Sequence, residues 1–566
     1  MNTDKHRFLK RKLKELKKIN RKKIDRLKNR ISKIHIHKSL KISVFICVHL
    51  WTIFLLSCNS APNDLRKFAP PETLVYLETN DLQKTLDSLT ENETFKRLTN
   101  GKKDFSALES VQLAVAVTGF ETSEKQVTDS QAVLNFKPKF VAVADTHAWE
   151  FQTISLTENQ INSFVNENYG GETGLEKTEK SGGKYFIWTA KDGRKIFAFV
   201  EGSLIFFGND ESSIEKSIAL TRGKTENFSN NSELATVYDQ SKNKLAFGFI
   251  SSAGIKQIAD FAGVSMAIET SEEDLPRNFI AKILPQILSK SVRRIVWTSE
   301  KNERGIVDNF RFETANEISD VLKETIVSVN QNAGDSSLFL PSDVQSATRY
   351  NLENPQIAWR SLLLSAGKQT DEQSAKILIA FADSFFAPFG ISSGELFLNS
   401  VNSEALTARF DVDGEKQAAI VTIKTAENLK KSLLPEFKKQ TENQNGAEIW
   451  KDEEDDLSAA FIENKLIIGD SESVLKCLEA KQTGENFTKS KYFQQFSESR
   501  AATVTFGKDD DQAHKIAEIL GNVKNKDLRT NSYFLTETKF EANHFVRKTT
   551  SDFGFVGTIL EQFAER

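Results

Sequence analysis

Cysteine is scarce in this chain of 566 residues, which contains only Cys47, Cys58 and Cys477. Cys47 lies in an apolar run near the N-terminus, so cleavage before Cys58 would leave two cysteines. If Cys58 is chemically modified, Cys477 has no partner for an internal disulfide. The sequence therefore excludes a disulfide framework and a zinc site built from cysteines. Cys477 itself lies in a helical pattern, where we expect a small buried side chain.

The motifs that usually mark an active site are also missing. The chain has no glycine-rich phosphate loop and no Gly-x-Ser-x-Gly sequence. Three of its seven histidines follow Cys58, namely His147, His514 and His544. None of these has a second His or a Cys at metal-ligand spacing, so a metal site would require convergence in the tertiary structure. The sequence thus predicts no cofactor, no metal and no enzyme activity.

Basic charge is concentrated at one end of the chain. Residues 1–41 contain 17 Lys and Arg against three acidic residues, a net charge of +14. The remaining 58 basic and 75 acidic residues give the rest of the chain a net charge of −17. Nucleic-acid binding requires a basic surface, so this acidic body argues against a nucleic-acid partner.

The apolar run that follows the basic segment is short. Residues 42–57 form an uncharged run of 16 residues, whereas a membrane-spanning helix needs about 20. A basic segment followed by such a run is typical of a signal peptide. Leu55, Leu56 and Ser57 precede Cys58, and this sequence resembles the lipobox of bacterial lipoproteins. An uncleaved membrane anchor and a soluble protein are the alternatives.

The resemblance implies cleavage before Cys58 and acylation of its thiol and of its new amine. Two or more acyl chains give stable anchoring, since each buried CH₂ contributes about 0.8 kcal/mol. Asn59 follows the cysteine, which by analogy with proteobacterial sorting favours the outer membrane. Residues 1–57 are then a basic segment and signal peptide, and residues 58–67 a lipidated tether. The basic segment is unusually long for a signal peptide. Either it forms an amphipathic helix on the inner leaflet, or translation starts downstream of Met1.

Two parts of the body share a series of short matches. The sequence YFIWTAKDG (185–193) matches AEIWKDEED (447–455), and EGSLIFFGNDESSIEKSI (201–218) matches ENKLIIGDSESVLKCL (463–478). Four anchors occur in the same order at offsets that drift by only three residues: Trp188 with Trp450, Gly208 with Gly469, Asn227 with Asn486, and Phe247 with Phe506. This pattern indicates an internal repeat.

Each repeat combines predicted strands with a few helices. Aromatic and β-branched runs separated by Asp-Gly or Gly turns predict antiparallel strands, and a helix follows Gly208 and Gly469. In the first repeat either Asp210 or Ser212 is expected to cap this helix, and Ser212 with Glu215 has capping-box spacing. Asp470 and Ser471 are the matching candidates in the second repeat. The sequence therefore predicts an α+β fold with two tandem copies of a mainly antiparallel sheet, residues 68–330 and 338–566. The linker is expected around residues 329–343, which are rich in Asn, Gly, Asp and Ser.

The whole body resembles uncharacterised two-repeat bacterial envelope proteins of a domain-of-unknown-function family. Those proteins also open with a Pro-led strand and contain the strand–Gly-Asp–helix step found here at Gly469 and Asp470. The resemblance implies a fold and an envelope location for this chain. It implies no catalytic activity.

One motif in the repeats is shared with serine acylases. This motif is Ser-x-x-Lys, in which the Lys lies one helical turn after the Ser and can activate it. It occurs at Ser213 with Lys216 and at Ser473 with Lys476. Because both repeats carry the motif and no partner motif is present, we favour a structural role. Each Ser would then lie near a helix start, with its hydroxyl facing backbone N–H groups or solvent and the Lys in water.

Three further features have a functional and a structural interpretation. The sequence DVDG (411–414) is similar to the start of a calcium loop, but a hairpin turn fits better. The sequence DEEDD (452–456) could gather cations, but a solvated loop between strands is favoured. Phe is abundant, 42 residues in all, and is concentrated in 196–207 and 382–390. These Phe residues either line a site for a lipid or a partner, or fill the core of a sheet.

The leading hypothesis is a non-catalytic, lipid-anchored cell-envelope protein that faces the periplasm or the cell exterior. It would act as a scaffold or binding module for an unknown envelope protein, attached to the membrane through Cys58. A carrier for an apolar ligand in a Phe-lined groove is one alternative. A hydrolase whose site is assembled only in the tertiary structure is the other.

The lipid anchor leads to the first testable prediction. Replacing Cys58 with Ala should abolish labelling with radioactive palmitate and leave an unprocessed precursor, because acylation and cleavage both require the thiol. Electrophoretic mobility and labelling of the two proteins check this. Continued labelling of the Cys58→Ala variant, with unchanged mobility, would show that the lipobox interpretation is wrong.

Overall fold

The computed structural model describes residues 63–561, except 129–130, 169–170, 172, 224–225, 271–273, 329–334, 381, 444 and 525–529. Cys58, the basic segment and the apolar run 42–57 lie outside the described residues. We call the residues 63–328 the first half and the residues 335–561 the second half. None of the helices in this part of the chain combines the length and apolar composition needed to cross a bilayer.

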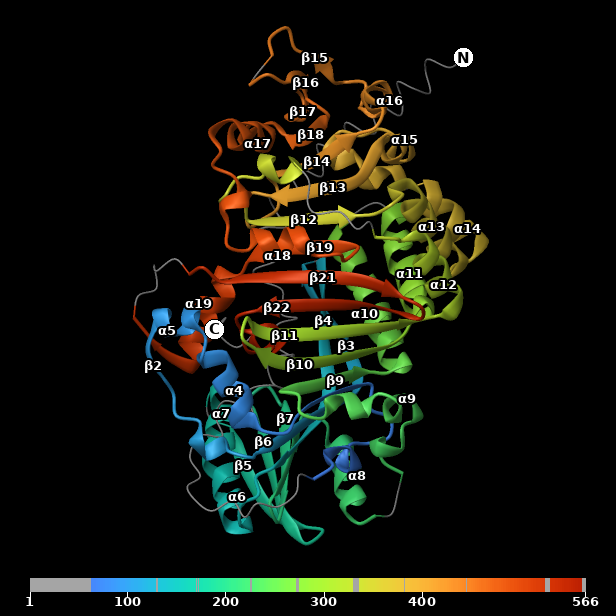
Figure 1. The fold of residues 1–566 in the computed structure, drawn as a ribbon. Helices are drawn as coiled ribbons and strands as arrows, with labels where there is room; N and C mark the ends of the chain where they lie inside the picture. The colour runs from blue at the N-terminus through green and yellow to red at the C-terminus, as the bar shows by residue number, and fades with distance from the viewer. Residues whose placement is uncertain are drawn as a thin grey trace.

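Nearly all strands belong to one antiparallel ladder that runs the length of the molecule (Figure 1). In the first half the neighbours follow the order β5 (Gly174–Lys180), β6 (Gly183–Thr189), β7 (Lys195–Glu201), β8 (Leu204–Gly208), β4 (Gln131–Asp145), β3 (Gln112–Thr128), β1 (Val75–Thr79), β9 (Ala246–Ile250), β10 (Val292–Asn302) and β11 (Gly305–Thr314).

The ladder continues directly into the second half, because β11 pairs with the last strand of the chain. From that point the neighbours are β22 (His544–Ser551), β21 (Tyr533–Glu541), β19 (Thr503–Lys508), β12 (Ser346–Asn351), β13 (Val401–Arg409), β14 (Gln417–Ile423), β18 (Lys465–Asp470), β17 (Leu457–Ile462), β16 (Glu448–Asp452) and β15 (Lys438–Lys439). A separate pair, β2 (Thr99–Lys102) and β20 (Gly521–Val523), links the two halves at the side.

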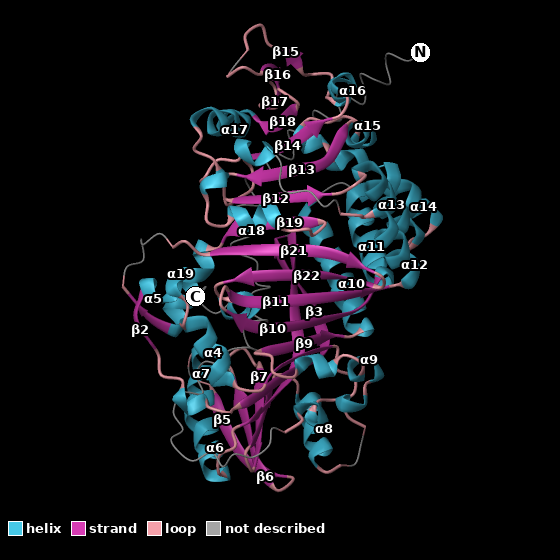
Figure 2. Cartoon of the chain, in the orientation of Figure 1, coloured by secondary structure: helices cyan, strands magenta, loops and turns pink. Residues whose placement is uncertain are grey.

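Helices cover the sheet on both faces (Figure 2). In the first half, α4 (Leu82–Thr90), α5 (Glu93–Leu98), α6 (Glu150–Leu156) and α7 (Asn162–Asn168) pack on one face, and α8 (Glu211–Thr221) and α9 (Ser232–Ala235) on the other. The α+β class and the mainly antiparallel sheet predicted from the sequence are confirmed.

The remaining helices are divided between the two halves. The first half contains α10 (Ser252–Thr270), α11 (Asp274–Ser291) and α12 (Asn316–Thr325). The second half contains α13 (Pro355–Lys368), α14 (Glu372–Ala380), α15 (Gly394–Asn399), α16 (Ala426–Ser432), α17 (Ser471–Thr483), α18 (Phe493–Glu498), α19 (Asp510–Leu520) and α20 (Gly554–Glu561). Part of the expected linker is packed: residues Asp335–Phe339 form a 3-10 helix, and Phe339 is fully buried.

The Phe-rich strands β7 and β8 lie between two layers of helices. Phe197, Phe199 and Phe206 point into the core on the α8 side, and Phe207 points into the core on the side of α7. All four side chains are buried. A strand that is covered on both faces reads as an uninterrupted apolar run, which is why the sequence shows little alternation here. This part of the Phe content therefore fills the sheet core.

The two halves are joined at the centre of the sheet by the antiparallel pair β11–β22. Phe312 is directly opposite Phe545, and their rings stack with centroids 4.4 Å apart. On the same face, Phe540 of β21 packs against Phe545 at 5.7 Å. Adjacent strands of one sheet share this apolar surface, so the two halves have a continuous core across the junction.

The last helix of each half packs against the other half. In α20, Phe555 contacts Trp297 of β10 and Phe310 of β11, with ring centroids 5.0 and 5.2 Å apart. The buried carboxylate of Asp308 accepts hydrogen bonds from Trp297 Nε1 at 2.8 Å and from the backbone N–H of Phe555 at 2.7 Å. It thereby satisfies an N–H group at the start of α20, which has no partner within the helix.

The helix α12 makes the reciprocal contact with the second half. Its buried residues Ile318 and Leu322 pack with Ala358 of α13 and Ala502, and Phe540 of β21 lies against this group. Each half thus supplies a helix to the other, and neither half buries its own final helix alone. We therefore expect the described body to unfold as one unit.

This interlocking leads to a prediction about stability. Phe553 is fully buried, and it belongs to a core that also contains Leu82 and Leu86 of the first half. Phe553→Ala should lower the free energy of unfolding by about 3–5 kcal/mol, because removal of a buried ring leaves a cavity. Calorimetry should show a single transition at a lower temperature.

The matched control is Val412→Ala on the surface, where the side chain is 77% exposed. It should change the free energy of unfolding by less than about 0.5 kcal/mol. Two separate transitions, only one of which shifts in Phe553→Ala, would contradict the shared core.

Candidate functional site

Cys58, the residue predicted to carry a lipid, lies outside the described residues, so its state stays a prediction. Cys477 is fully buried in α17, as the sequence predicts. Burial raises the pKa of its thiol, which disfavours the reactive thiolate. Cys477 is therefore a packing residue and not a nucleophile.

The first Ser-x-x-Lys pair has a structural role. Ser213 lies in the first turn of α8, and its backbone N–H donates to the N-cap residue Asp210 at 2.9 Å. Its buried hydroxyl lies 2.8 Å from Asp210 Oδ2 and 2.7 Å from Thr118 Oγ1. Lys216 is 53% exposed and forms a surface ion pair with Glu72. The position at a helix start is confirmed, but the hydroxyl faces a carboxylate and not solvent or a backbone N–H.

The second pair repeats this arrangement. Asp470 caps α17 and accepts from the backbone N–H of Ser473 at 2.9 Å. The Ser473 hydroxyl is buried and finds no hydrogen-bond partner among the described residues. Lys476 forms an ion pair with Glu472 at 2.9 Å on the surface. A Ser activated by Lys requires a desolvated amine beside the hydroxyl, and neither pair provides one.

The three histidines lie on different elements. His147 follows β4 and its Nδ1 lies 3.6 Å from Asp145, His514 is on α19, and His544 begins β22 beside Glu541 at 3.1 Å. In the described part of the chain, no group of three or more His, Cys, Asp or Glu residues is arranged to hold a metal ion. The histidines therefore do not converge on one site.

Both acidic stretches form turns between strands. Asp411–Gly414 connects β13 to β14, with Gly414 at a φ of +72° and Asp411 accepting from the backbone N–H of Lys416 at 3.2 Å. Residues 453–456 connect β16 to β17, and Asp452, the last residue of β16, accepts from the backbone N–H of Glu454 at 3.1 Å. The hairpin turn and the inter-strand loop are confirmed, although Asp452 is buried and not solvated.

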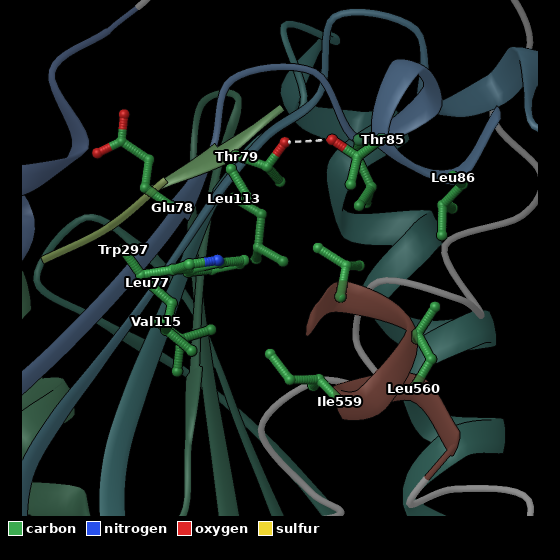
Figure 3. Close-up of a pocket in the computed structure, with 13 residues that line it drawn as sticks. Leu77, Glu78, Thr79, Thr85, Leu86, Leu113, Val115, Trp297, Ile559 and Leu560 are labelled. Atoms are coloured by element: carbon green, nitrogen blue, oxygen red, sulfur yellow. Dashed lines mark hydrogen bonds between the residues drawn. The ribbon is translucent and has the colours of Figure 1, made fainter. Parts of the chain in front are cut away.

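An apolar cavity lies between the sheet of the first half and the helices α4 and α20 (Figure 3). Leu77, Leu113 and Trp297 line it from the strands, and Leu560 lines it from α20. Figure 3 shows that the carboxylate of Glu78 points away from the cavity. Its volume is about 70 Å³. Ligand sites usually have volumes of about 300–1,000 Å³, so this cavity is a packing defect rather than a lipid site.

Glu78 belongs instead to a buried polar cluster on the other face of β1. It accepts from Tyr76 at 2.7 Å and from Tyr238 at 2.9 Å, and the guanidinium of Arg66 lies 3.3 Å from the centre of the Tyr238 ring. Burial raises the pKa of Glu78, while the two tyrosine hydrogen bonds lower it. This cluster attaches the first described turn of the chain, which also contains Asp64, to the sheet.

The largest hollow among these sites is a polar groove, about 1060 Å³ in volume, that we call the central groove. It is formed by four segments: 302–304, 491–499, 533–537 and 548–552. The first segment is the β10–β11 turn of the first half, and the other three belong to the second half. Along β21 and β22, Leu535, Glu537, Lys548 and Thr550 share one face of the sheet, because side chains alternate along a strand.

Charges of both signs lie along this groove. Glu537 and Lys548 are directly opposite each other on β21 and β22. Ser499 donates to Glu537, and the buried Arg349 donates to the carbonyl oxygen of Ser499 behind the wall formed by α18. Desolvation lowers the pKa of Arg349, but an arginine side chain keeps its charge in proteins. The wall is thus fixed from behind by a buried cation.

Two tyrosines supply the aromatic surface of the groove. The rings of Tyr492 and Tyr533 lie 4.3 Å apart, and Phe506 lies 5.2 Å from Tyr533. Burial and the neighbouring charge of Asp552 raise the pKa of Tyr492, and burial and Tyr492 raise the pKa of Tyr533. Both phenols therefore stay neutral near pH 7 and can donate or accept hydrogen bonds.

Acidic groups gather near Asp552 at the border of the groove. Burial, together with the negative charges of Glu561, Asp552 and Asp510, raises the pKa of Asp509 to about 7. Asp509 therefore takes up a proton near neutral pH, which is unusual for a carboxylate.

No pattern in the sequence indicates the central groove. Its segments are separated by as many as 250 residues, and each reads as an ordinary turn, helix or strand. Comparison with protein-family models, with curated proteins and with solved structures finds no match for this chain.

The raised pKa of Asp509 predicts a pH dependence of stability. In the unfolded chain its pKa is about 3.9, so between about pH 4 and pH 7 only the folded state holds the proton. Stability should fall as the pH rises through this window and then level off. Asp509→Asn removes this loss, up to about 4 kcal/mol at pH 8, and flattens the profile.

Urea unfolding at a series of pH values measures this difference. Asp413→Asn on the β13–β14 turn is the charge-matched control and should leave the wild-type profile unchanged. Parallel pH profiles for the wild type and Asp509→Asn would contradict the assignment.

Proposed function

We propose that this chain is a non-catalytic, lipid-anchored cell-envelope protein that binds a partner protein in the central groove. The observation that carries the proposal is the groove itself, which is large and polar and lies at the junction of the two halves. The membrane attachment rests on the lipobox resemblance at Cys58. The body faces the periplasm or the cell exterior.

The start of the described chain supports a short connection to the membrane. The backbone N–H of Asn63 donates to Gln112 at 2.8 Å, and Gln112 Nε2 donates back to the carbonyl oxygen of Asn63 at 3.0 Å. Asn63 is only five residues after Cys58. A chain segment of this length spans at most about 18 Å, so an acylated Cys58 would hold the body close to the bilayer.

We also propose that the two halves are copies of one unit. The order β6, β7, β8, β4, β3, β1, β9, β10, β11 of the first half corresponds, strand for strand, to the order β16, β17, β18, β14, β13, β12, β19, β21, β22 of the second. Trp188 lies on β6 and Trp450 on β16. Chance similarity of composition does not explain a shared order of this length.

Local interactions support the same proposal. The backbone N–H of Phe228 donates to Ala69, and that of Phe487 donates to Leu340. A Cβ atom at Gly208 would collide with a carbonyl oxygen of β4, and one at Gly469 with a backbone carbonyl beside β14. The glycines are therefore required by close strand approach, which explains why both repeats keep them.

A polar protein surface is the occupant that the groove fits best. The basic side chains of the groove include Lys491 and Lys548, and its acidic side chains include Glu498 and Glu537. Its tyrosines add amphipathic contact area. Protein interfaces commonly combine tyrosines with paired charges in this way. A long apolar ligand would have to desolvate these charges without pairing them, which is costly.

The alternatives have weaker support. A carrier requires a large apolar site, whereas the apolar cavity beside α20 has a volume of only about 70 Å³. A hydrolase remains an alternative through residues that meet only in the fold. The Ser-x-x-Lys residues do not favour it, because Ser213 faces Asp210 and Thr118 while Lys216 lies in a surface ion pair.

Site-specific photo-crosslinking in cells tests the binding proposal. A photoreactive residue at Gln494 of the groove wall should give an adduct of defined mass, because a partner seated in the groove contacts this position. The same residue at the exposed Gln373 of α14 is the matched control and should give none. Lys548→Glu should reduce the Gln494 adduct about tenfold, since two like charges would then face the partner.

Equal adduct yields at Gln494 and Gln373 would contradict the proposal. So would an adduct at Gln494 whose yield is unchanged by Lys548→Glu.

A further inference from the structure

Two aromatic side chains protrude from the first half beside the start of α6. Trp149 is 68% exposed and Phe151 is 70% exposed, whereas most aromatic rings in the described part of the chain are buried or half-buried. Exposed apolar side chains that lie close together on the surface mark contact sites for a protein or a membrane. Trp149 is the N-cap residue of α6 and Phe151 lies in its first turn.

The turn that presents them is firmly held. Asp145 is fully buried and accepts from the backbone N–H of His147 at 3.0 Å. The hydroxyl of Thr146 lies 3.1 Å from that of Thr153 on α6. The backbone N–H of Trp149 donates to the side chain of Gln152, one helical turn further along the chain, at 3.1 Å. The aromatic pair is therefore displayed on a defined support, which reduces the entropy lost on binding.

This support is also the attachment point of the N-terminal segment. The amide Nδ2 of Asn63 donates to the same Asp145 carboxylate that holds the turn. Asp145 precedes Trp149 by four residues, and Cys58 precedes Asn63 by five. Because five residues span at most about 18 Å, an acylated Cys58 places the bilayer surface within reach of this turn.

The second half has no such pair at the corresponding place. There, β14 leads into α16, and the exposed residues at the helix start are Lys424, Thr425, Ala426 and Glu427. The strand-to-helix step alone therefore does not require exposed aromatic residues. At this step they occur in the half that continues into the N-terminal segment and not in the other half.

We propose that Trp149 and Phe151 insert into the membrane interface next to the lipid anchor and fix the orientation of the first half on the bilayer. Tryptophan is favoured at the headgroup level and phenylalanine in the adjoining acyl region. Glu150 lies between the two residues, so the contact depends on apolar insertion and not on attraction to anionic lipid. This inference rests on the proposed anchor at Cys58.

Fluorescence quenching in vesicles tests the insertion. The purified full chain is reconstituted into phosphatidylcholine vesicles whose acyl chains carry bromine near the headgroup, and the bound fraction is measured by flotation. Bromine should quench the emission of the wild type more than that of Trp149→Phe. Phe151→Glu keeps the reporter but should lower the quenching of Trp149 by about half, because a charge disfavours insertion.

The matched control is Ala426→Trp in the second half, which adds an exposed tryptophan that bromine should not quench. If the protein binds vesicles but its quenching does not depend on Trp149, the insertion is overturned and the proposed anchor stands. Flotation of Cys58→Ala with undiminished quenching would instead show that the aromatic pair binds membranes without the anchor, which would overturn its dependence on Cys58. If the wild type shows no flotation and no quenching, both proposals are overturned.

Discussion

The antiparallel pairing of β11 with β22 is the interaction on which the rest of the architecture depends. Without it, each half would end in a strand with unpaired N–H and C=O groups, which invites non-specific association. The pairing satisfies both edges at once, from Ile306 opposite Ser551 to Glu313 opposite His544. It also fixes the positions of α12 and α20, each of which follows one of the two strands and packs across the junction.

The central groove is a consequence of the same pairing. Its floor is formed by β21 and β22, and the β10–β11 turn of the first half closes one side. Separated halves would have neither this wall nor the continuous floor. A partner bound there would contact both halves, so binding would stabilise the junction as well as the complex.

A buried carboxylate gives this junction a defined geometry. Burial raises the pKa of Asp308, but the hydrogen bonds from Trp297 and Phe555 oppose that shift. Misaligned halves would remove the hydrogen bond from Phe555, which is the one that crosses the junction, and a lost partner is costly for a buried charge in a low-dielectric interior. Figure 1 shows α6 at the lower end of the molecule and β22 near its middle, so the proposed membrane contact leaves the groove open to a partner.

The sequence by itself determined the features that depend on short-range chemistry. Asp210 and Asp470 mark helix starts, and the Asp413-Gly414 pair marks a hairpin turn. Such constraints act over a few residues, so they are visible as patterns, and the α+β class follows from them. The tertiary structure alone decided how the two halves are joined, where the central groove lies, and which of the aromatic side chains remain exposed. These depend on contacts between segments far apart in the chain, and nothing local distinguishes Trp149 from the buried Trp188.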